Sequence, residues 1–354
     1  MKPTVQTFAL IACGALLLSG CERPPIESVQ KGYRGTGMEQ INNPRRVAEL
    51  MDANVVPVAL PAAAADGPRA REVFQNVQVL GDLSVAEFSR LMASLTEWVA
   101  PEQGCNYCHV EGESLADDSL YTKTVSRQML AMTRHINSEW GAHVAQTGVT
   151  CFTCHRGKNV PANVWFEDPA KLRAVGSMGN RAGQNDASRS VALASLPYDP
   201  FSIFLKEANN IRVVPGRALP TNYTQDIHDT ERTYGLMMHM SDGLGVNCTF
   251  CHNSRQFSNW TESTPQRVTA WHGIRMARDL NVQYLLPIQG QFPKNRLGPT
   301  GDVAKINCTT CHQGVNKPLY GSSLYQSYPE LGPARPEPVD PAIAADDLPS
   351  DAGG

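Results

Sequence analysis

The chain of 354 residues contains four copies of one short motif, C-x-x-C-H, and this repeat constrains its fold more than any other feature. The spacing is that of c-type haem attachment: two thiols form thioethers with the vinyl groups of one porphyrin, and the adjacent imidazole binds the iron. The attachment cysteines are Cys105, Cys108, Cys151, Cys154, Cys248, Cys251, Cys308 and Cys311, and the proximal histidines are His109, His155, His252 and His312.

Other chemistries of paired cysteines fit this pattern less well. Structural zinc sites, redox dithiols and disulfides all use C-x-x-C, but none requires a histidine directly after the second cysteine of every pair. Only 9 of the 354 residues are histidine, so four such neighbours are not expected by chance. We therefore predict four covalently bound haems c. Of the 10 cysteines, only Cys13 and Cys21 lie outside the motifs, which leaves none for a disulfide.

The amino terminus has the pattern of a bacterial lipoprotein signal. Lys2 is followed by the short apolar stretch Phe8 to Leu18, and the tetrapeptide Leu-Ser-Gly-Cys ends at Cys21. The apolar stretch is too short to span a bilayer stably, so we predict a signal peptide at residues 1–20. Cys21 would then carry the lipid and anchor an N-terminal segment, residues 21–80, at a membrane surface. An ordinary secretory signal with an incidental cysteine is the alternative.

The motifs alternate between two types. The second and fourth share C-x-T-C-H-x-G-x-N-x-P over Cys151–Pro161 and Cys308–Pro318, whereas the first and third share an aromatic residue, Tyr107 and Phe250, before the second cysteine. This A-B-A-B order predicts two related halves that bind two haems each. The boundaries that we predict are residues 81–162 for the first dihaem half, 163–220 for a connecting segment, 221–319 for the second dihaem half and 320–354 for a flexible tail rich in Pro, Ala and Asp.

A helix is predicted ahead of each motif. A capping box and an apolar stripe over Ser84–Val99 indicate the first, and apolar residues over Val125–Ile136 indicate a second that runs on to His143. A short helix over Tyr234–Met240 precedes the third motif. Thr264-Pro265 begins the helix ahead of the fourth.

Methionines on these helices are candidates for the sixth iron ligand. Met92 lies 13 residues before the first motif and Met237 lies 11 before the third, and each follows a leucine. A methionine stripe on a helix is usually core packing. Four irons that need a second ligand nearby favour coordination here. The alternatives that remain open are Met238 and Met240 for the third haem and Met129 or Met132 for the second.

The fourth haem lacks an equivalent methionine. Aligning the helices ahead of the second and fourth motifs places Gly273 opposite Met129, and glycine has no side chain to bind iron. His143 lies 14 residues after Met129, about 21 Å further along a continuous helix, so the two cannot share one iron. His143 is therefore a candidate ligand for a haem of the other half. His272 is the local alternative, and His135 lies on another helix face.

Taken together, these features resemble the tetrahaem cytochrome c subunit of purple-bacterial photosynthetic reaction centres, over roughly Cys21 to Pro318. The resemblance implies a mainly α multihaem cytochrome c with long irregular loops, whose two halves are related by a pseudo-two-fold and bind two haems each. It also implies three His/Met haems and one bis-His haem. The ligands that it selects, in haem order, are Met92, Met129, Met237 and His143.

The resemblance further implies a function in electron transfer. Such a subunit is lipid-anchored at the periplasmic face of the photosynthetic inner membrane, on the reaction-centre core subunits. It relays electrons from a soluble periplasmic donor, a small cytochrome c or a high-potential iron–sulfur protein, to the photo-oxidised special pair. Its haems form a near-linear chain, with the third nearest the special pair and the first furthest out.

Other functions are less consistent with the sequence. If every iron has two protein ligands, no position is open for substrate, so an enzyme is not expected. A multihaem oxidoreductase with one open iron is the main alternative, and a free-standing respiratory lipoprotein cytochrome is another. The formal net charge of −3 argues against nucleic-acid binding, which normally needs a basic excess.

Overall fold

The computed structural model describes residues 25–168, 187–213 and 226–336. The predicted signal peptide, Cys21 and parts of the connecting segment and tail lie outside them. The described chain is mainly helical, with one antiparallel hairpin in which Glu27 pairs with Asn42 and Lys31 with Met38. The strands and α-helices are β1 (Glu27–Lys31), β2 (Met38–Asn42), α2 (Pro44–Ala53), α3 (Ala70–Val73), α4 (Val85–Val99), α5 (Tyr121–Glu139), α6 (Gly141–Val144), α7 (Cys151–His155), α8 (Ile227–Leu244), α9 (Pro265–Leu280) and α10 (Cys308–His312). The short 3₁₀ and π turns are η1 (Gly104–Tyr107), η2 (Arg189–Val191), η3 (Ser202–Lys206), η4 (Cys248–Phe250), η5 (Asn281–Leu285), η6 (Leu286–Gln291), η7 (Lys294–Arg296), η8 (Pro318–Gly321), η9 (Leu324–Ser327) and η10 (Pro329–Leu331).

The helices predicted ahead of the motifs are present, and their caps explain where they begin. The Ser84 hydroxyl accepts from the Glu87 backbone N–H (3.1 Å), and the Glu87 carboxylate accepts from the Ser84 N–H (3.0 Å), so α4 starts with a capping box. Helix α8 is longer than the predicted Tyr234–Met240. The Asp226 carboxylate caps it by accepting from the Asp229 N–H at 2.9 Å, and its polar first turns hide the helical period.

The predicted continuous helix from Val125 to His143 is interrupted. Helix α5 ends at Glu139, Trp140 has a non-helical backbone (φ −102°, ψ 28°), and the short α6 follows. The Trp140 indole N–H donates to Asp279 of α9 at 3.0 Å. This contact ties the break to the other half of the chain, which a local helix pattern does not reveal.

The two predicted halves repeat the same hydrogen bonds at aligned positions. The Asn137 side chain pairs with the backbone of Val149 (3.0 and 2.8 Å), two residues before the second motif. The Asn281 side chain pairs in the same way with Ile306 (3.0 and 2.8 Å), two residues before the fourth. Each asparagine therefore fixes the chain that leads into a C-x-x-C-H segment.

A second repeated bond joins the long helices to the motifs. The Gly157 N–H donates to the Trp98 carbonyl of α4 at 2.9 Å, and the Gly314 N–H donates to the Gly243 carbonyl of α8 at 2.8 Å. Trp98 and Gly243 each lie six residues after the leading methionine candidate of their helix. The same packing of helix on motif thus occurs in both halves.

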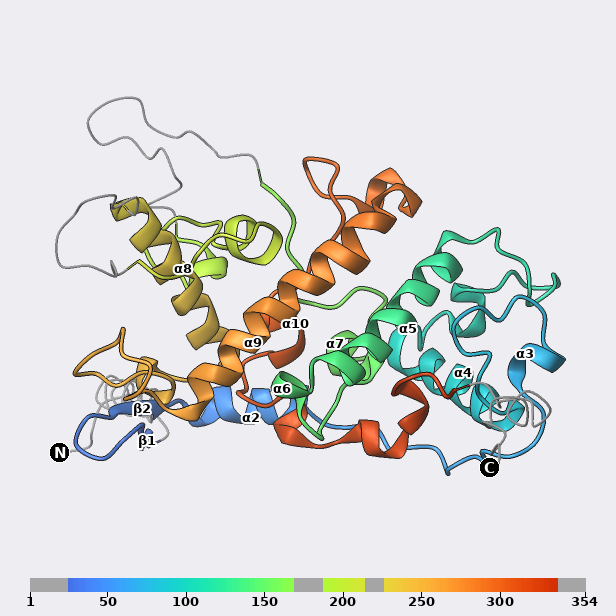
Figure 1. Cartoon of the computed structure of the whole chain (residues 1–354), viewed down its shortest axis with the longest axis horizontal. Coiled ribbons are helices and arrows are strands. Elements are labelled where there is room, and N and C mark those ends of the chain that lie inside the picture. Colours follow the sequence, from blue (N-terminus) through green and yellow to red (C-terminus); the bar gives the residue numbers. More distant parts are fainter. Residues whose placement is uncertain (1–24, 169–186, 214–225, 337–354) are drawn as a thin grey trace, which may run out of the picture.

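The molecule is elongated (Figure 1). Helices α4 and α5 lie towards one end, the hairpin and α8 lie towards the other, and α7 and α10 lie between them. Two hydrophobic clusters form the core. The first-half cluster is built on Leu80, Leu83, Leu91, Trp98, Leu130, Tyr328 and Leu331, and the second-half cluster on Trp165, Phe201, Phe204, Leu205, Leu236, Ile274 and Leu280.

The prediction of a flexible tail from residue 320 onward is wrong for residues 320–336. Tyr328 and Leu331 are fully buried in the first-half cluster. The Glu330 carboxylate accepts a 2.7 Å bond from the Arg90 guanidinium of α4, and both side chains are buried. Apolar anchors and a buried ion pair hold this segment, although its composition resembles a linker. None of the helices within residues 25–168, 187–213 and 226–336 combines the length and the hydropathy of a membrane span.

Candidate haem-binding sites

The two motif types differ in backbone conformation as they do in sequence. The first and third motifs form the 3₁₀ turns η1 and η4, whereas the second and fourth form the α-helical turns α7 and α10. Thr153 and Thr310 each take part in a capping box at the start of these turns, with Thr150 and Asn307 as their partners. The threonine shared by C-x-T-C-H is therefore a cap that orients the turn.

The shared glycine after the second and fourth motifs reverses the chain. Arg156 and Gln313 end α7 and α10 in the left-handed region, with φ of 50° and 49°. Gly157 and Gly314 follow with φ of 76° and 87°, a conformation that glycine adopts without strain. This turn directs the chain back over the histidine.

Three motif histidines are held by the same contact. In each, the imidazole Nδ1 lies within hydrogen-bond distance of a backbone carbonyl a few residues later, which makes Nδ1–H the donor and leaves the Nε2 lone pair for a metal. Burial lowers the pKa of all three, to about 4 for His312, so they are neutral at pH 7. The bonds are His155 to Lys158 (2.8 Å), His252 to Phe257 (2.8 Å) and His312 to Val315 (3.1 Å).

The first motif differs in this respect. The Nδ1 atom of His109 is buried and makes no hydrogen bond of ordinary geometry within the described chain. Burial lowers the pKa of His109 as well, and the nearby Lys123 ammonium lowers it further. A neutral imidazole is thus available at all four motifs.

Three of the motif thiols do not resemble reactive or zinc-binding cysteines. Burial raises the pKa of Cys151 and Cys308 to about 12 and that of Cys251 to about 11. Redox dithiols and zinc thiolates need a lowered pKa. In the parts of the chain that the structure describes, no group of three or more His, Cys, Asp or Glu side chains is placed to hold a metal ion.

One cysteine pair contradicts the expectation that no disulfide forms. The structure joins Cys154 and Cys311, the second cysteines of the second and fourth motifs, whose Cα atoms are 4.5 Å apart. The contact arises because α7 and α10 pack on each other, with the Arg156 guanidinium donating to the Cys311 carbonyl at 3.3 Å. A sulfur cannot be in a disulfide and a thioether at once, so haem attachment here requires both thiols reduced.

His143 reaches the other half of the chain, as the alignment with Gly273 predicts. Its Nδ1 donates to the Thr269 carbonyl of α9 at 2.9 Å. A Cβ atom on Gly273 would lie 2.5 Å from Cε1 of His143 and 3.1 Å from Nε2. The missing side chain of Gly273 is therefore what makes room for this imidazole.

The His143 ring lies close to the ring of the proximal histidine of the fourth motif, in an edge-type arrangement. The ring centres of His143 and His312 are 6.0 Å apart, with an interplanar angle of 67°. Two imidazoles bound to opposite sides of one iron by bonds of about 2 Å have ring centres about 6 Å apart. The pair fits a bis-His haem. The alternatives make other contacts: His135 bonds to Asp279 at 2.7 Å, and His272 packs on Trp271.

The methionine candidates lie on the predicted helices but are not distinguished from one another. Met92 on α4 is partly buried against the first-half cluster, and Met129 on α5 and Met237 on α8 are partly buried against the second-half cluster. Met132 and Met240 share that environment. The choice of methionine ligand stays a prediction.

One contact of the third motif has no sequence signal. Thr249, between the two cysteines, is fully buried under the N-terminal hairpin. Its hydroxyl donates to the Lys31 carbonyl at 2.6 Å and accepts from the Met38 N–H at 2.8 Å. Gly32 is needed for this approach, since a Cβ there would lie 2.5 Å from the Thr249 carbonyl oxygen.

Comparison with known proteins decides the family. The model of the photosynthetic reaction centre cytochrome c subunit family matches residues 22–332. The chain belongs to this family. The reaction center cytochrome c subunit of Rubrivivax gelatinosus is 57% identical over 342 residues, covering 96% of this chain and 91% of the relative. That of Thermochromatium tepidum is 50% identical, covering 94% and 82%, and that of Roseobacter denitrificans is 41% identical, covering 86% and 85%.

Membership of the reaction-centre cytochrome c subunits establishes the broad chemistry. The chain is an electron-transfer component of a photosynthetic reaction centre, and a cytochrome c carries covalently bound haem. It associates with the reaction-centre core and hence with the membrane. The four imidazoles described above fit that cofactor.

Proposed function

We propose that this chain is a tetrahaem relay that carries electrons from a soluble periplasmic donor to the photo-oxidised special pair. The observation that carries the proposal is the His143–His312 pair, with ring centres 6.0 Å apart, in a chain with four C-x-x-C-H motifs. The haems supply the change of iron oxidation state. The motif cysteines would attach them, and the motif histidines with His143 and the helix methionines would bind the irons, which would leave no iron open to a substrate.

For the other three irons we propose one histidine and one methionine each. A thioether ligand raises the reduction potential, so these three haems are expected to have higher potentials than the bis-His haem by ligand type. Attachment at the second and fourth motifs consumes the thiols of Cys154 and Cys311. The proposed pairs are His109 with Met92, His155 with Met129, and His252 with Met237.

The N-terminal hairpin supports the proposed orientation. We propose that Cys21 carries the lipid anchor at the periplasmic face of the membrane. Strand β1 begins at Glu27, six positions after Cys21, and six residues span at most about 21 Å. Because the hairpin is bonded to Thr249, the third motif would lie near the membrane and the reaction-centre core.

The opposite end suits a soluble donor. Glu102, Glu111 and Glu113 are exposed around the first motif. An acidic surface attracts a donor with a basic patch. This favours entry of electrons at the first haem, with a small cytochrome c or a high-potential iron–sulfur protein as the donor.

Flash excitation of membranes that contain the chain tests the proposal. The expected result is oxidation of its haems in under a millisecond, followed by re-reduction when the soluble donor is added. Haems that stay reduced after the flash would indicate a free-standing respiratory cytochrome. Stoichiometric binding of carbon monoxide to one native haem would instead indicate an open iron and an oxidoreductase.

A further inference from the structure

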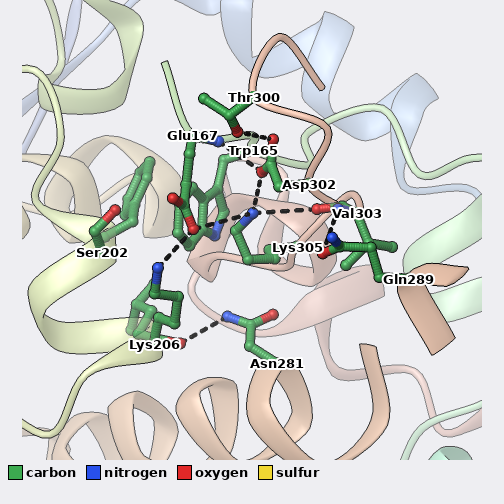
Figure 2. Close-up of polar contacts among 12 residues, drawn as sticks. Trp165, Glu167, Ser202, Lys206, Asn281, Gln289, Thr300, Asp302, Val303 and Lys305 are labelled. Carbon is green, nitrogen blue, oxygen red and sulfur yellow. Dashed lines mark hydrogen bonds and ion pairs between the residues drawn. The ribbon is translucent and has the colours of Figure 1, made fainter. Parts of the chain in front are cut away.

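A buried lysine lies just before the fourth motif and has no part in the site described so far. Lys305 is completely buried, three residues ahead of Cys308. Its ammonium donates to the Asp302 carboxylate and to the Val303 carbonyl at 3.1 Å, and it lies 4.4 Å from the centre of the Trp165 ring (Figure 2).

Further charges surround this ammonium. A Glu167 oxygen lies 3.9 Å from the Lys305 nitrogen and accepts a 2.7 Å bond from Lys206 (Figure 2). The Asp302 carboxylate also accepts from the Glu167 N–H at 2.8 Å and from the Thr300 hydroxyl at 2.7 Å. Burial acts to raise the pKa of Asp302, but these bonds outweigh it and lower the pKa. The positive charges of Lys305 and Lys206 therefore balance the negative charges of Asp302 and Glu167.

The network is fixed to the chain that enters the fourth motif. Lys305 and Trp165 exchange two backbone hydrogen bonds of 2.9 Å, and the Trp165 indole N–H donates to the Ile306 carbonyl at 3.0 Å. Three residues span at most about 10 Å, so the Lys305 backbone lies within that distance of the Cys308 backbone. The charges therefore have a set position relative to the attachment cysteine.

The equivalent position in the first half carries no charge. Because Ile306 matches Val149, Lys305 matches Gly148, which packs against the Tyr325 ring. The ammonium is thus a feature of the fourth motif that the repeat does not share. A buried charge acts on a nearby redox group with little screening.

We propose that Lys305, with Asp302 and Glu167, positions the fourth motif and sets the reduction potential of its haem. The inference rests on the proposed function. A positive charge favours the reduced iron and raises the potential, whereas an uncompensated carboxylate lowers it. Removing the positive charge or one of the carboxylates should therefore shift the reduction potential of the fourth haem in a predictable direction.

Equilibrium redox titration of the full haem-loaded chain tests the proposal, with the bis-His haem followed by electron paramagnetic resonance. Lys305→Met is expected to lower the potential of the fourth haem, and Asp302→Asn to raise it. If both variants shifted the potential in the same direction, the electrostatic role would be overturned, because an effect of lost packing does not depend on the sign of the charge removed. No shift in either variant would overturn it as well.

Two further comparisons keep the test decisive. Glu167→Gln and Lys206→Met change side chains that are about 30% exposed, and they replace the buried variants if those do not fold. Glu167→Gln is expected to raise the potential and Lys206→Met to lower it, each by less than the buried variants. Lys123→Met is the matched control: Lys123 is buried beside the first motif and should leave the fourth haem unchanged. An equal shift there would refute the inference. Titration of the wild-type protein tests the proposed function separately: fewer than four haems would refute the proposed function, whatever the variants show.

Discussion

Replacing Gly273 by alanine is the sharpest test of the proposed fourth ligand pair. The added Cβ would lie 2.5 Å from His143, against 3.4 Å for an ordinary contact, so the imidazole must move by about 0.9 Å. Metal–ligand distances tolerate changes of about 0.2 Å. The substitution therefore removes or distorts the His143 bond to iron. Alanine in the interior of α9 is favoured over glycine by about 1 kcal/mol, so the fold itself should not weaken.

The assay compares the spectrum of the fourth haem with the stability of the protein. Gly273→Ala is expected to convert the bis-His haem to a form that binds carbon monoxide, while the thermal midpoint stays the same or rises. His143→Ala should reproduce the spectral change and leave the second haem largely intact. Gly141→Ala is the control, because a Cβ at Gly141 meets nothing within 4 Å.

An unchanged spectrum in Gly273→Ala, with no carbon monoxide binding, would show that His143 is not the ligand. A change at the second haem instead of the fourth would contradict the pairing across halves. A fall in the thermal midpoint together with changes at all four haems would mean that the glycine serves the fold and not the site.

The other predictions concern the third haem, a buried ion pair and acid stability. Met237→Leu should lower the potential of the third haem or open it to external ligands; an unchanged potential and spectrum would move the assignment to a neighbouring methionine. Arg90→Met leaves the Glu330 carboxylate buried without its partner, which should cost about 3–5 kcal/mol in chemical denaturation; a loss below about 1 kcal/mol would contradict this. Burial acts to raise the pKa of Glu87, but hydrogen bonds from Arg335 lower it overall. The ionised Glu87 therefore stabilises the fold above the unfolded pKa of about 4, and this stabilisation is lost as the pH falls through the lowered folded-state pKa. Thermal midpoints measured from about pH 7 to 3 should fall less steeply in Glu87→Gln than in the wild type, and identical slopes would argue against this role.

The parts of the fold that sequence predicts are those with a local chemical reason. The capping box at Ser84, the start of α9 at Pro265 and the two motif types depend on residues a few positions apart. The alignment places Gly273 opposite Met129 and so indicates that a fourth ligand must come from elsewhere; the structure adds that the His143 imidazole lies where a Cβ of Gly273 would be.

The features that sequence does not predict depend on contacts between distant segments. Trp140 breaks a helical pattern because its indole bonds to Asp279, 139 residues later. The described part of the tail, residues 320–336, is held through Glu330, whose partner lies 240 residues earlier. The Cys154–Cys311 contact likewise follows from the packing of α7 on α10. No period or motif near these residues signals such partners.

The differences between the two halves gather around the fourth motif. Where the first half has Met129, the second has Gly273 and receives His143 from the other half. Where the first half has Gly148, the second has the buried Lys305. In the proposed arrangement, a repeated scaffold would fix where each haem is attached, while single differences at matched positions would change its ligand and its surrounding charge. On this proposal, the haem potentials would differ along the chain without any change in the backbone that spaces the motifs.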